Sequence, residues 1–510
     1  MKLLCRALTT IGFVLGTSAI AAPQLMLEDV GQVSLQNSGS ESAQQAFHHG
    51  LAQLHNFEYA SAASDFREAQ TLDPDFALAY WGEAMTHNHP IWMRQDRETA
   101  LSILERLGPT PEARRDKAGT ELEKDLLSAL DILFGSGEKQ ARDDRYSAFL
   151  GELYELYPGN VEVASFYALS LMGTAHEGRD FATYMRAAAI MQDFIVDYPQ
   201  HPGVAHYLIH ATDDPIHAPL GLRAAQAYSD IAPNAAHAQH MTSHIFLALG
   251  DWDGVIKANT RATDLINRKR TAEGRLLAGC GHYPSWLMYG YLQQAKLEAA
   301  EELMLQCRKN VEDSAAGQTS GYYAWQRALY LFDTGRWDGD IANYTFDFGE
   351  RHKAALEHRV IDGWVALKRE NIAVAQAALA DAEALAVALQ AAWDAQGIAA
   401  DQPSRKEPAV HILQLRAMIT LVGGDTALSL SQLREAVAME MDLPFGFGPP
   451  SPPKPSLELL GETLLALGQY AEAIEALRAS LARTPEKLAS VAALARAEAR
   501  MAEQVQDAAN

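Results

Sequence analysis

Five histidines recur at a fixed interval near the middle of the chain. His176, His210 and His244 are each 34 residues apart, and His206 and His240 keep the same interval. In the pairs His206/His210 and His240/His244 the spacing is i, i+4, which puts both side chains on one face of a helix. Imidazole nitrogen binds Zn, Cu, Fe and Ni, so histidines on neighbouring helices can together hold a transition-metal ion.

The spacing predicts a metal site built from adjacent helices. Packed helices lie about 8–10 Å apart and Zn–N bonds are about 2 Å long, so imidazoles from two helices can meet on one ion. Met172 and Met241 nearby would favour copper. The predicted cofactor is therefore Zn or Cu, and its predicted ligands are His206, His210, His240 and His244, with His176 as a weaker one.

Other polar residues adjoin this set. His237 lies three residues before His240 and extends the same helix face, and His217 lies in a loop with Asp213 and Asp214. A metal-bound imidazole needs an acceptor for its second nitrogen, which these aspartates can supply. The predicted groove-lining residues are His176, His206, His210, His217, His237, His240, His244, Asp213 and Asp214.

Two interpretations without a metal remain open. Groove histidines can bind a peptide or its carboxylate by hydrogen bonds, or duplicated repeats can keep a histidine for packing alone. The remaining histidines are expected to have other roles: His87, His89 and His282 as structural residues, and His48, His49 and His55 as surface residues.

No catalytic motif accompanies the histidines. The sequence has no G-x-S-x-G, P-loop, dinucleotide fingerprint or H-E-x-x-H motif. We therefore expect binding ahead of catalysis and assign no catalytic residue. The alternative is a metal-dependent hydrolase or oxidoreductase, with Asp213 or Asp214 as the base.

The elements that must position the histidines are pairs of helices. A 34-residue period, kept also by Pro199 and Pro233, is typical of a helix–turn–helix repeat, and stacked repeats form a solenoid. The 42 Lys and Arg against 65 Asp and Glu give a formal charge of −23. Such a charge argues against binding to nucleic acid or to an anionic membrane.

The last repeat has the pattern of a known family. The residues that carry it are Leu457, Leu460, Gly461, Leu464, Gly468, Tyr470, Ala473, Leu477, Ser480 and Pro485. This repeat resembles the tetratricopeptide (TPR) family. The resemblance implies an all-α, right-handed superhelix in which the first helix of each repeat lines a concave groove. That groove would receive a peptide, protein or small-molecule ligand.

The TPR resemblance and the turn signals divide the chain into eight segments. They are 1–21, a signal peptide; 22–40, a flexible lead-in; 41–94, N-terminal TPR repeats; 95–159, degenerate helical pairs; 160–312, a regular TPR block with the histidines; 313–442, looser TPR-like helices; 443–455, a proline-rich connection; and 456–505, a C-terminal TPR with a capping helix. The segment 443–455 cannot be helical. We expect it to be a spacer, with a lid over the groove as the alternative.

The N-terminus and the cysteines bear on the compartment. Lys2 and Arg6 precede a short apolar stretch and a small-residue cleavage site, which predicts a secretory signal. The mature chain keeps Cys280 and Cys307, which can either form a disulfide or remain buried thiols. We expect a periplasmic or extracellular protein with no transmembrane segment in the mature chain.

The mature chain also resembles a group of secreted bacterial TPR proteins. The segments that carry this likeness are 81–90, 206–219, 240–246, 283–286 and 445–450. The likeness implies the fold and the export of the chain, and it supplies no activity.

Overall fold

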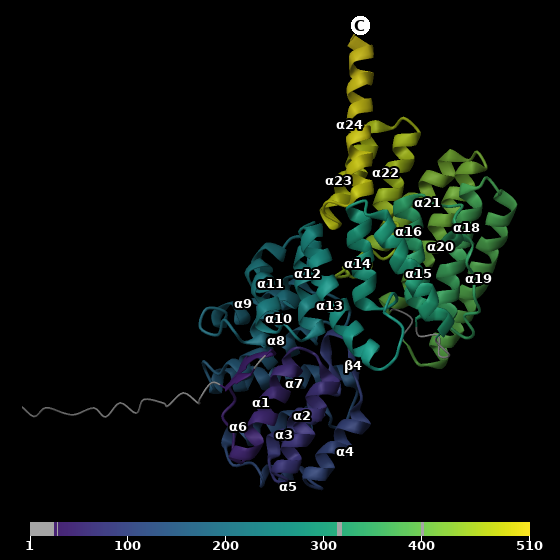
Figure 1. Cartoon of the computed structure of the whole chain (residues 1–510). Helices are drawn as coiled ribbons and strands as arrows, with labels where there is room; N and C mark the ends of the chain where they lie inside the picture. The colour runs from purple at the N-terminus through teal and green to yellow at the C-terminus, as the bar shows by residue number, and fades with distance from the viewer. Residues whose placement is uncertain (1–24, 28, 314–318, 399–401, 510) are drawn as a thin grey trace, which may run out of the picture.

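Antiparallel helix pairs follow one another along the chain, and most helices pack on the next (Figure 1). The computed structural model describes residues 25–27, 29–313, 319–398 and 402–509. Within these residues the chain forms 24 α-helices and two short antiparallel strand pairs. The predicted all-α solenoid of TPR-like helix pairs is confirmed. The predicted signal peptide, 1–21, lies outside the described residues.

Three large hydrophobic cores succeed one another along the solenoid. The first section holds β1 (Leu25–Leu27), β2 (Gly31–Val33), α1 (Glu41–His55), α2 (Tyr59–Leu72), α3 (Ala77–Met85), β3 (Asn88–His89), the 3-10 turn η1 (Pro90–Trp92), β4 (Arg94–Gln95), α4 (Arg97–Leu107), α5 (Pro111–Arg115), α6 (Glu121–Leu133) and α7 (Lys139–Leu156). The second holds α8 (Val161–Met172), α9 (Phe181–Phe194), α10 (Pro202–Thr212), α11 (Ala218–Ile231), α12 (Ala236–Ala248) and α13 (Trp252–Ala272).

The third section completes the chain. It holds α14 (His282–Gln293), α15 (Leu297–Asp313), α16 (Ser320–Thr334), α17 (Asp340–Asn343), α18 (His352–Lys368), α19 (Ile372–Ala395), α20 (Pro403–Val422), α21 (Thr426–Met441), α22 (Ser456–Ala466), α23 (Tyr470–Arg483) and α24 (Leu488–Ala509). Each section buries its own apolar faces, as expected of a solenoid in which a repeat contacts its neighbours.

The segment before α1 is ordered where the structure describes it, which differs from the flexible lead-in expected for residues 22–40. Strand β2 pairs with β1, and the N–H of Gln32 donates to the carbonyl of Gln200 at 2.9 Å. Val33 and Leu35 are buried in the first core. Because these apolar side chains are packed, the segment ties the first helices to the start of α10.

The C-terminal helix pair returns to the middle of the chain. The indole N–H of Trp252 donates to the carbonyl of Glu486 at 3.0 Å, and the N–H of Leu488 donates to the side chain of Gln293 at 3.0 Å. The last repeat therefore packs across the solenoid as well as along it.

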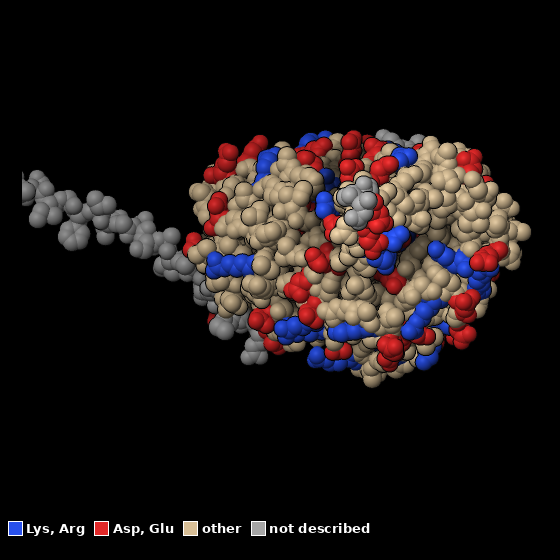
Figure 2. All heavy atoms as spheres, turned by 90° about the horizontal axis from the view of Figure 1, so that it is seen from above, with Lys and Arg blue, Asp and Glu red and all other residues tan. Residues whose placement is uncertain are grey.

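Figure 2 shows one face of the molecule, on which acidic and basic side chains are interspersed around a recess.

One helix of the described chain is long and apolar enough to cross a membrane by length and composition. This helix is α19, whose mean hydropathy reaches 1.7 over its most apolar window. It is rich in alanine, and it packs between α18 and α20 with Ala375, Ala378 and Ala382 buried. We expected no membrane-spanning segment in the mature chain. Helix α19 is one candidate by length and composition, and in this structure it packs as a helix of the third core.

Cys280 and Cys307 form a disulfide. Cys280 lies just before α14 and Cys307 lies within α15, so the bond closes a loop that contains one helix of the third section. Both cysteines are buried. Of the two alternatives left open by the sequence, the structure contains the disulfide.

Removing this disulfide is expected to destabilise the third section. Because the bond restricts the unfolded chain over 27 residues, the double variant Cys280→Ser/Cys307→Ser should lose about 2–4 kcal/mol of unfolding free energy. Urea unfolding followed by circular dichroism measures the loss. The wild-type protein in reductant should show the same loss, and an unchanged midpoint in both samples would contradict the expectation.

Candidate metal centre

Three helices bring six histidines together. His206 and His210 project from α10, and α12, which packs on α10, supplies three more. The sixth begins α14. The full set is His206, His210, His237, His240, His244 and His282. All but His282 are buried, and His282 is exposed to the neighbouring pocket.

The first group, here called the inner triad, is His206, His210 and His237. Each residue offers one ring nitrogen, and the three nitrogens lie within 4.8 Å of one another. The Nε2 atom of every one of these rings is buried and has no hydrogen-bond partner. A buried polar atom without a partner costs about 1–3 kcal/mol, so three of them side by side call for a ligand.

The orientation of His206 is fixed by the backbone. Its Nδ1 donates to the carbonyl oxygen of His55 at 2.6 Å. Since a neutral imidazole carries one N–H, Nε2 is left with a lone pair that points into the cluster. A main-chain carbonyl on the second ring nitrogen is a usual partner of a metal-binding histidine.

The second group, here called the outer triad, is His240, His244 and His282. Their ring nitrogens also lie within 4.8 Å of one another. His240 Nδ1 lies 2.6 Å from the amide oxygen of Asn259, and His244 Nδ1 lies 2.7 Å from Oδ2 of Asp213. The Nε2 atoms of His240 and His244 lie 3.1 Å apart.

Asp213 joins the two triads. Its Oδ2 lies 2.7 Å from Nδ1 of His244 in the outer triad and 3.7 Å from Nδ1 of His210 in the inner triad. Its other oxygen forms an ion pair with Arg179, which is also buried. Burial alone would raise the pKa of Asp213, but Arg179 and the two imidazoles lower it below its usual range. The carboxylate therefore stays ionised and orients a ring in each triad.

Aromatic side chains enclose the cluster. The Phe57 ring centroid lies 4.3 Å from that of His206, and the Tyr228 ring stacks on His206 at 5.4 Å. On the pocket side, Trp286 and Phe447 both stack on His244, at 4.5 and 5.5 Å. This apolar enclosure excludes water and strengthens electrostatic interactions inside it.

Burial sets the charge of the imidazoles. It lowers the pKa of His206, His237 and His240 well below the usual value, and the neighbouring histidines lower it further. These rings are therefore neutral at pH 7. Neutral imidazole is the form that binds a metal ion.

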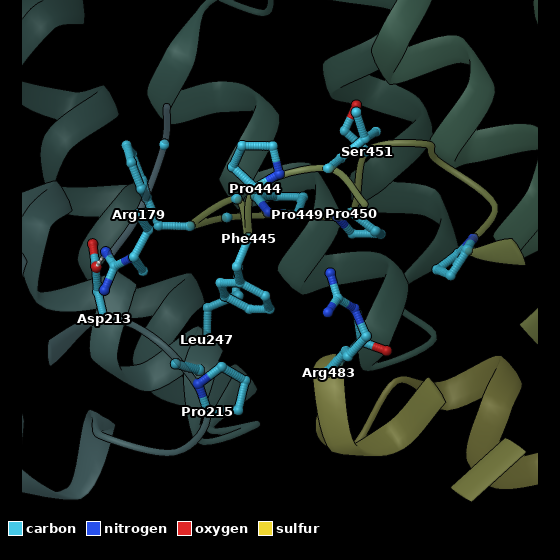
Figure 3. A pocket seen from close by; sticks show the side chains of 18 of the residues that line it. Arg179, Asp213, Pro215, Leu247, Pro444, Phe445, Pro449, Pro450, Ser451 and Arg483 are labelled. Atoms are coloured by element: carbon cyan, nitrogen blue, oxygen red, sulfur yellow. Dashed lines mark hydrogen bonds and ion pairs between the residues drawn. The ribbon is translucent and has the colours of Figure 1, made fainter. Parts of the chain in front are cut away.

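A pocket of about 610 Å³ adjoins the cluster. Its wall includes His282 and Asp213 from the cluster, and Trp286 and Phe447, which separate it from the buried rings. Figure 3 shows Arg179 beside Asp213 on one side of this pocket and Arg483 on the other. Arg483 lies over the ring of Phe445.

The proline-rich segment 443–455 forms one wall of this pocket. It connects α21 to α22, as a spacer would, and it also lays Phe447 against His244 and His210. Gly448 has φ of 137°, and a Cβ there would lie 2.8 Å from the Trp286 ring. The segment thus has the position expected of a lid.

The structure divides the predicted ligand set. His206 and His210 belong to one triad, while His240 and His244 belong to the other, and each pair gains a third histidine. His237 was predicted to line the groove. His282 was expected to be structural and instead stands in the outer triad, between the cluster and the pocket.

Three predicted residues lie outside both triads. His176 follows the end of α8 and pairs with Asp144 at 2.9 Å, although it reaches the pocket wall. His217 and Asp214 pair with each other at 2.9 Å, and Asp214 also lies 3.4 Å from Arg179. In this structure His176, predicted as a weaker ligand, lies outside both triads and pairs with Asp144.

A further histidine cluster was missed. His55, expected at the surface, is fully buried with Glu162 and His201. The carboxylate of Glu162 accepts from Nε2 of His55 at 2.7 Å and of His201 at 3.1 Å, and His55 Nδ1 bonds to the Tyr207 hydroxyl. Because these nitrogens have partners, this cluster acts as a polar core between α1, α8 and α10.

His48 was also expected at the surface and is buried, with Nδ1 bonded to the carbonyl of Gln44. His49 is half-exposed and pairs with Asp65. Arg179, which anchors Asp213, was not predicted either. Its partner lies 34 residues away in the next repeat, so no local sequence pattern reveals the contact.

Comparison with known proteins supports the repeat class. A family model for the tetratricopeptide repeat matches residues 455–487. A comparison with curated proteins finds no match. The fold and the site together define a TPR-like α-solenoid with a buried polyhistidine cluster.

Similar solved structures are remote. Yeast Tom70 is 12% identical, with 92% of this chain and 97% of that chain covered and a TM-score of 0.34. The APC/C hetero-tetramer Cut9-Hcn1 is 14% identical, with 91% and 78% covered and a TM-score of 0.34. The human IFIT1 dimer with m7Gppp-AAAA is 12% identical, with 93% and 89% covered and a TM-score of 0.35. Such scores do not bear on ligand or activity.

Proposed function

We propose that this chain is a TPR-like scaffold that binds a transition-metal ion at the inner triad and a ligand in the adjoining pocket. The observation that carries the proposal is that three histidines, His206, His210 and His237, each have a buried Nε2 atom without a hydrogen-bond partner, and that a ring nitrogen of each lies within 4.8 Å of the others. The His55–Glu162–His201 cluster has the same kinds of residue, yet its ring nitrogens are bonded.

The donor set favours Zn or Cu. It consists of imidazole nitrogens, which suit borderline ions, and it lacks the carboxylate-rich character preferred by Mg²⁺ or Ca²⁺. Nitrogens on one tetrahedral ion lie about 3.4 Å apart, and the three ring nitrogens lie within 4.8 Å of one another, so small rotations of the rings suffice to bind one ion. Three protein ligands leave a fourth position for water or a ligand atom.

The pocket favours an apolar ligand that carries an anionic group. Trp286, Phe445 and Phe447 offer aromatic surface, and the guanidinium of Arg483 stands at the wall. Arg179 is already committed to Asp213, so Arg483 is the cation left to meet an anion. A peptide or protein segment with these features fits the binding role expected of a TPR scaffold.

Elemental analysis tests the metal site. Wild-type protein loaded with Zn²⁺ and desalted should retain metal, and His206→Gln/His210→Gln/His237→Gln should lose the ion held by the inner triad. The control His176→Gln should retain as much as wild type, because its partner is Asp144. Circular dichroism establishes that the variants fold. Equal metal content in the triad variant and wild type would overturn the proposal.

A metal-dependent enzyme is the second candidate. The observation in its favour is that His282 and Asp213 belong both to the cluster and to the pocket wall, so a ligand can approach the metal centre. A bound ion there would lower the pKa of its water or polarise a ligand oxygen. Hydrolysis of p-nitrophenyl acetate that requires metal and His282 would support this role, and equal rates in metal-free protein would contradict it.

Export from the cell forms part of the proposal. The disulfide between Cys280 and Cys307 supports an oxidising compartment, since structural disulfides are rare in the cytosol of most organisms. Fractionation of producing cells tests this point, and a purely cytosolic protein with free thiols would contradict it.

A further inference from the structure

In the outer triad, the Nε2 atoms of His240 and His244 face each other. Asn259 donates its amide N–H to the carbonyl of Val255 at 2.9 Å, so its amide oxygen points to His240 and accepts from Nδ1. Asp213 accepts from Nδ1 of His244, because a carboxylate has no proton to give. Each ring then has its Nδ1 bonded to an oxygen, and the two Nε2 atoms lie 3.1 Å apart.

A transition-metal ion beside these two Nε2 atoms would be bound by both. The third member of the group, His282, brings its own nitrogen within 4.8 Å of the other two. We propose that His240, His244 and His282 bind a second transition-metal ion beside the first, so that the six histidines form a dinuclear centre. This inference rests on the proposed inner site and extends it.

Asp213 couples the two ion positions. Its Oδ2 lies 2.7 Å from Nδ1 of His244 and 3.7 Å from Nδ1 of His210. It therefore interacts with one ring of each triad. The set His210, Asp213 and His244 itself falls within the 4.8 Å limit, so the two sites are contiguous. The ring centroids of His210 and His244 are 5.6 Å apart, so the two triads adjoin each other.

The outer ion is the one open to a ligand. The inner triad is covered by Phe57 and Tyr228, whereas His282 is exposed to the pocket. Its place at the start of α14, next to Gly281 with φ of 126°, lets the ring reach both the cluster and the pocket. A pocket ligand therefore meets the outer ion first.

Charge identifies the class of that ligand. Two divalent ions bring four positive charges to a cluster whose six imidazoles carry no negative charge. Among the described residues, the carboxylates that contact the triads are Asp213, already paired with Arg179, and Glu58, which accepts the backbone N–H of His237. The pocket wall adds Glu407 and Glu440, and we expect the remaining compensating charge from an oxygen anion, such as a carboxylate or hydroxide, that enters the pocket and bridges the ions.

Metal stoichiometry tests the second site. Apoprotein loaded with Cu²⁺ and desalted is expected to hold two ions per chain in the wild type and in the surface control His49→Gln. His282→Gln should hold one, and it leaves the buried core untouched because His282 is exposed to the pocket. His240→Gln/His244→Gln should also hold one, with folding checked by circular dichroism.

Electron paramagnetic resonance supplies a second readout. Magnetic coupling between neighbouring Cu²⁺ ions should make the integrated signal of wild type fall well below its copper content, and His282→Gln should recover the full signal of one ion. One ion per chain in wild type, unchanged in His282→Gln, would overturn the dinuclear centre and leave the inner site standing. One ion lost in variants of either triad would mean a single shared site and would also overturn it. No ion in wild type would refute both proposals.

Discussion

Removal of the metal with a chelator is expected to lower the free energy of unfolding by about 4 kcal/mol, relative to protein with free metal at about 1,000 times its dissociation constant. The ion would join α10 to α12 through His206, His210 and His237. The unfolded chain does not hold these imidazoles together, so binding stabilises only the folded state. Urea unfolding with added Zn²⁺ and with EDTA measures the difference.

The inner-triad variant separates this effect from general salt or chelator effects. His206→Gln/His210→Gln/His237→Gln should show a smaller difference in urea midpoint between Zn²⁺ and EDTA than wild type does, because only the outer triad can still bind an ion. His49→Gln, whose imidazole pairs with Asp65 away from the cluster, should respond as wild type does. A wild-type protein that is indifferent to EDTA would contradict the prediction.

Lys487→Met is expected to destabilise the protein by about 3–5 kcal/mol. The ammonium of Lys487 is fully buried, 2.8 Å from Asp333 and 3.2 Å from Glu458. Removing one partner of a buried ion pair leaves the other charges without compensation, and only Lys454 still pairs with Glu458. Because Lys487 joins the C-terminal helices to α16, the loss should appear as early unfolding of the last repeat.

A matched surface variant gives the control. Lys124 forms an exposed pair with Glu121, so Lys124→Met should leave the urea midpoint unchanged. The double variant Lys487→Met/Glu458→Gln should recover part of the lost stability, since it removes the stranded carboxylate as well. Equal midpoints for Lys487→Met and Lys124→Met would show that the buried network contributes nothing.

The same network predicts how stability changes with acid. Burial alone would raise the pKa of Glu458, but Lys487 and Lys454 lower it to about 2. A carboxyl whose pKa is lower in the folded state stabilises the fold above the unfolded pKa of about 4.5, and this contribution is lost as pH falls toward 2. The acid dependence of unfolding should therefore be weaker in Lys487→Met.

Much of the fold could be predicted because local signals and the repeat period agree. The run of apolar and small residues from Ala77 to Met85 forms α3, and the side chains of Thr110 and Thr120 cap the helices that follow them. The i, i+4 pairs on α10 and α12 also lie where the period places them. These features depend on neighbouring residues, which a sequence displays directly.

The period failed at His176 because α8 stops early. Gly173 ends α8 after Met172, and a Cβ at Gly173 would lie 2.9 Å from Pro90. The chain therefore leaves the helix four residues before the position that is equivalent to His210. The 34-residue period of the sequence therefore includes His176, although the helix has already ended there.

His282 and the buried His55–Glu162 pair could not be predicted for a different reason. His282 follows the 21-residue helix α13 and lies out of the 34-residue register. His55 on α1 and Glu162 on α8 are 107 residues apart and meet because both helices pack on α10. Such contacts depend on how repeats close in space, and the sequence alone does not show that closure.

The backbone carbonyl oxygen of His55 accepts a hydrogen bond from Nδ1 of His206 and so fixes the orientation of that ring. Every amino acid carries this oxygen, so exchanging the side chain at position 55 leaves the acceptor in the chain. Substitutions at position 55 would therefore report the loss of the side-chain bond to Glu162. They would not report the role of the backbone in orienting His206. The support of this imidazole is encoded by the path of the chain, and it tolerates changes of residue type as long as the turn after α1 keeps its course.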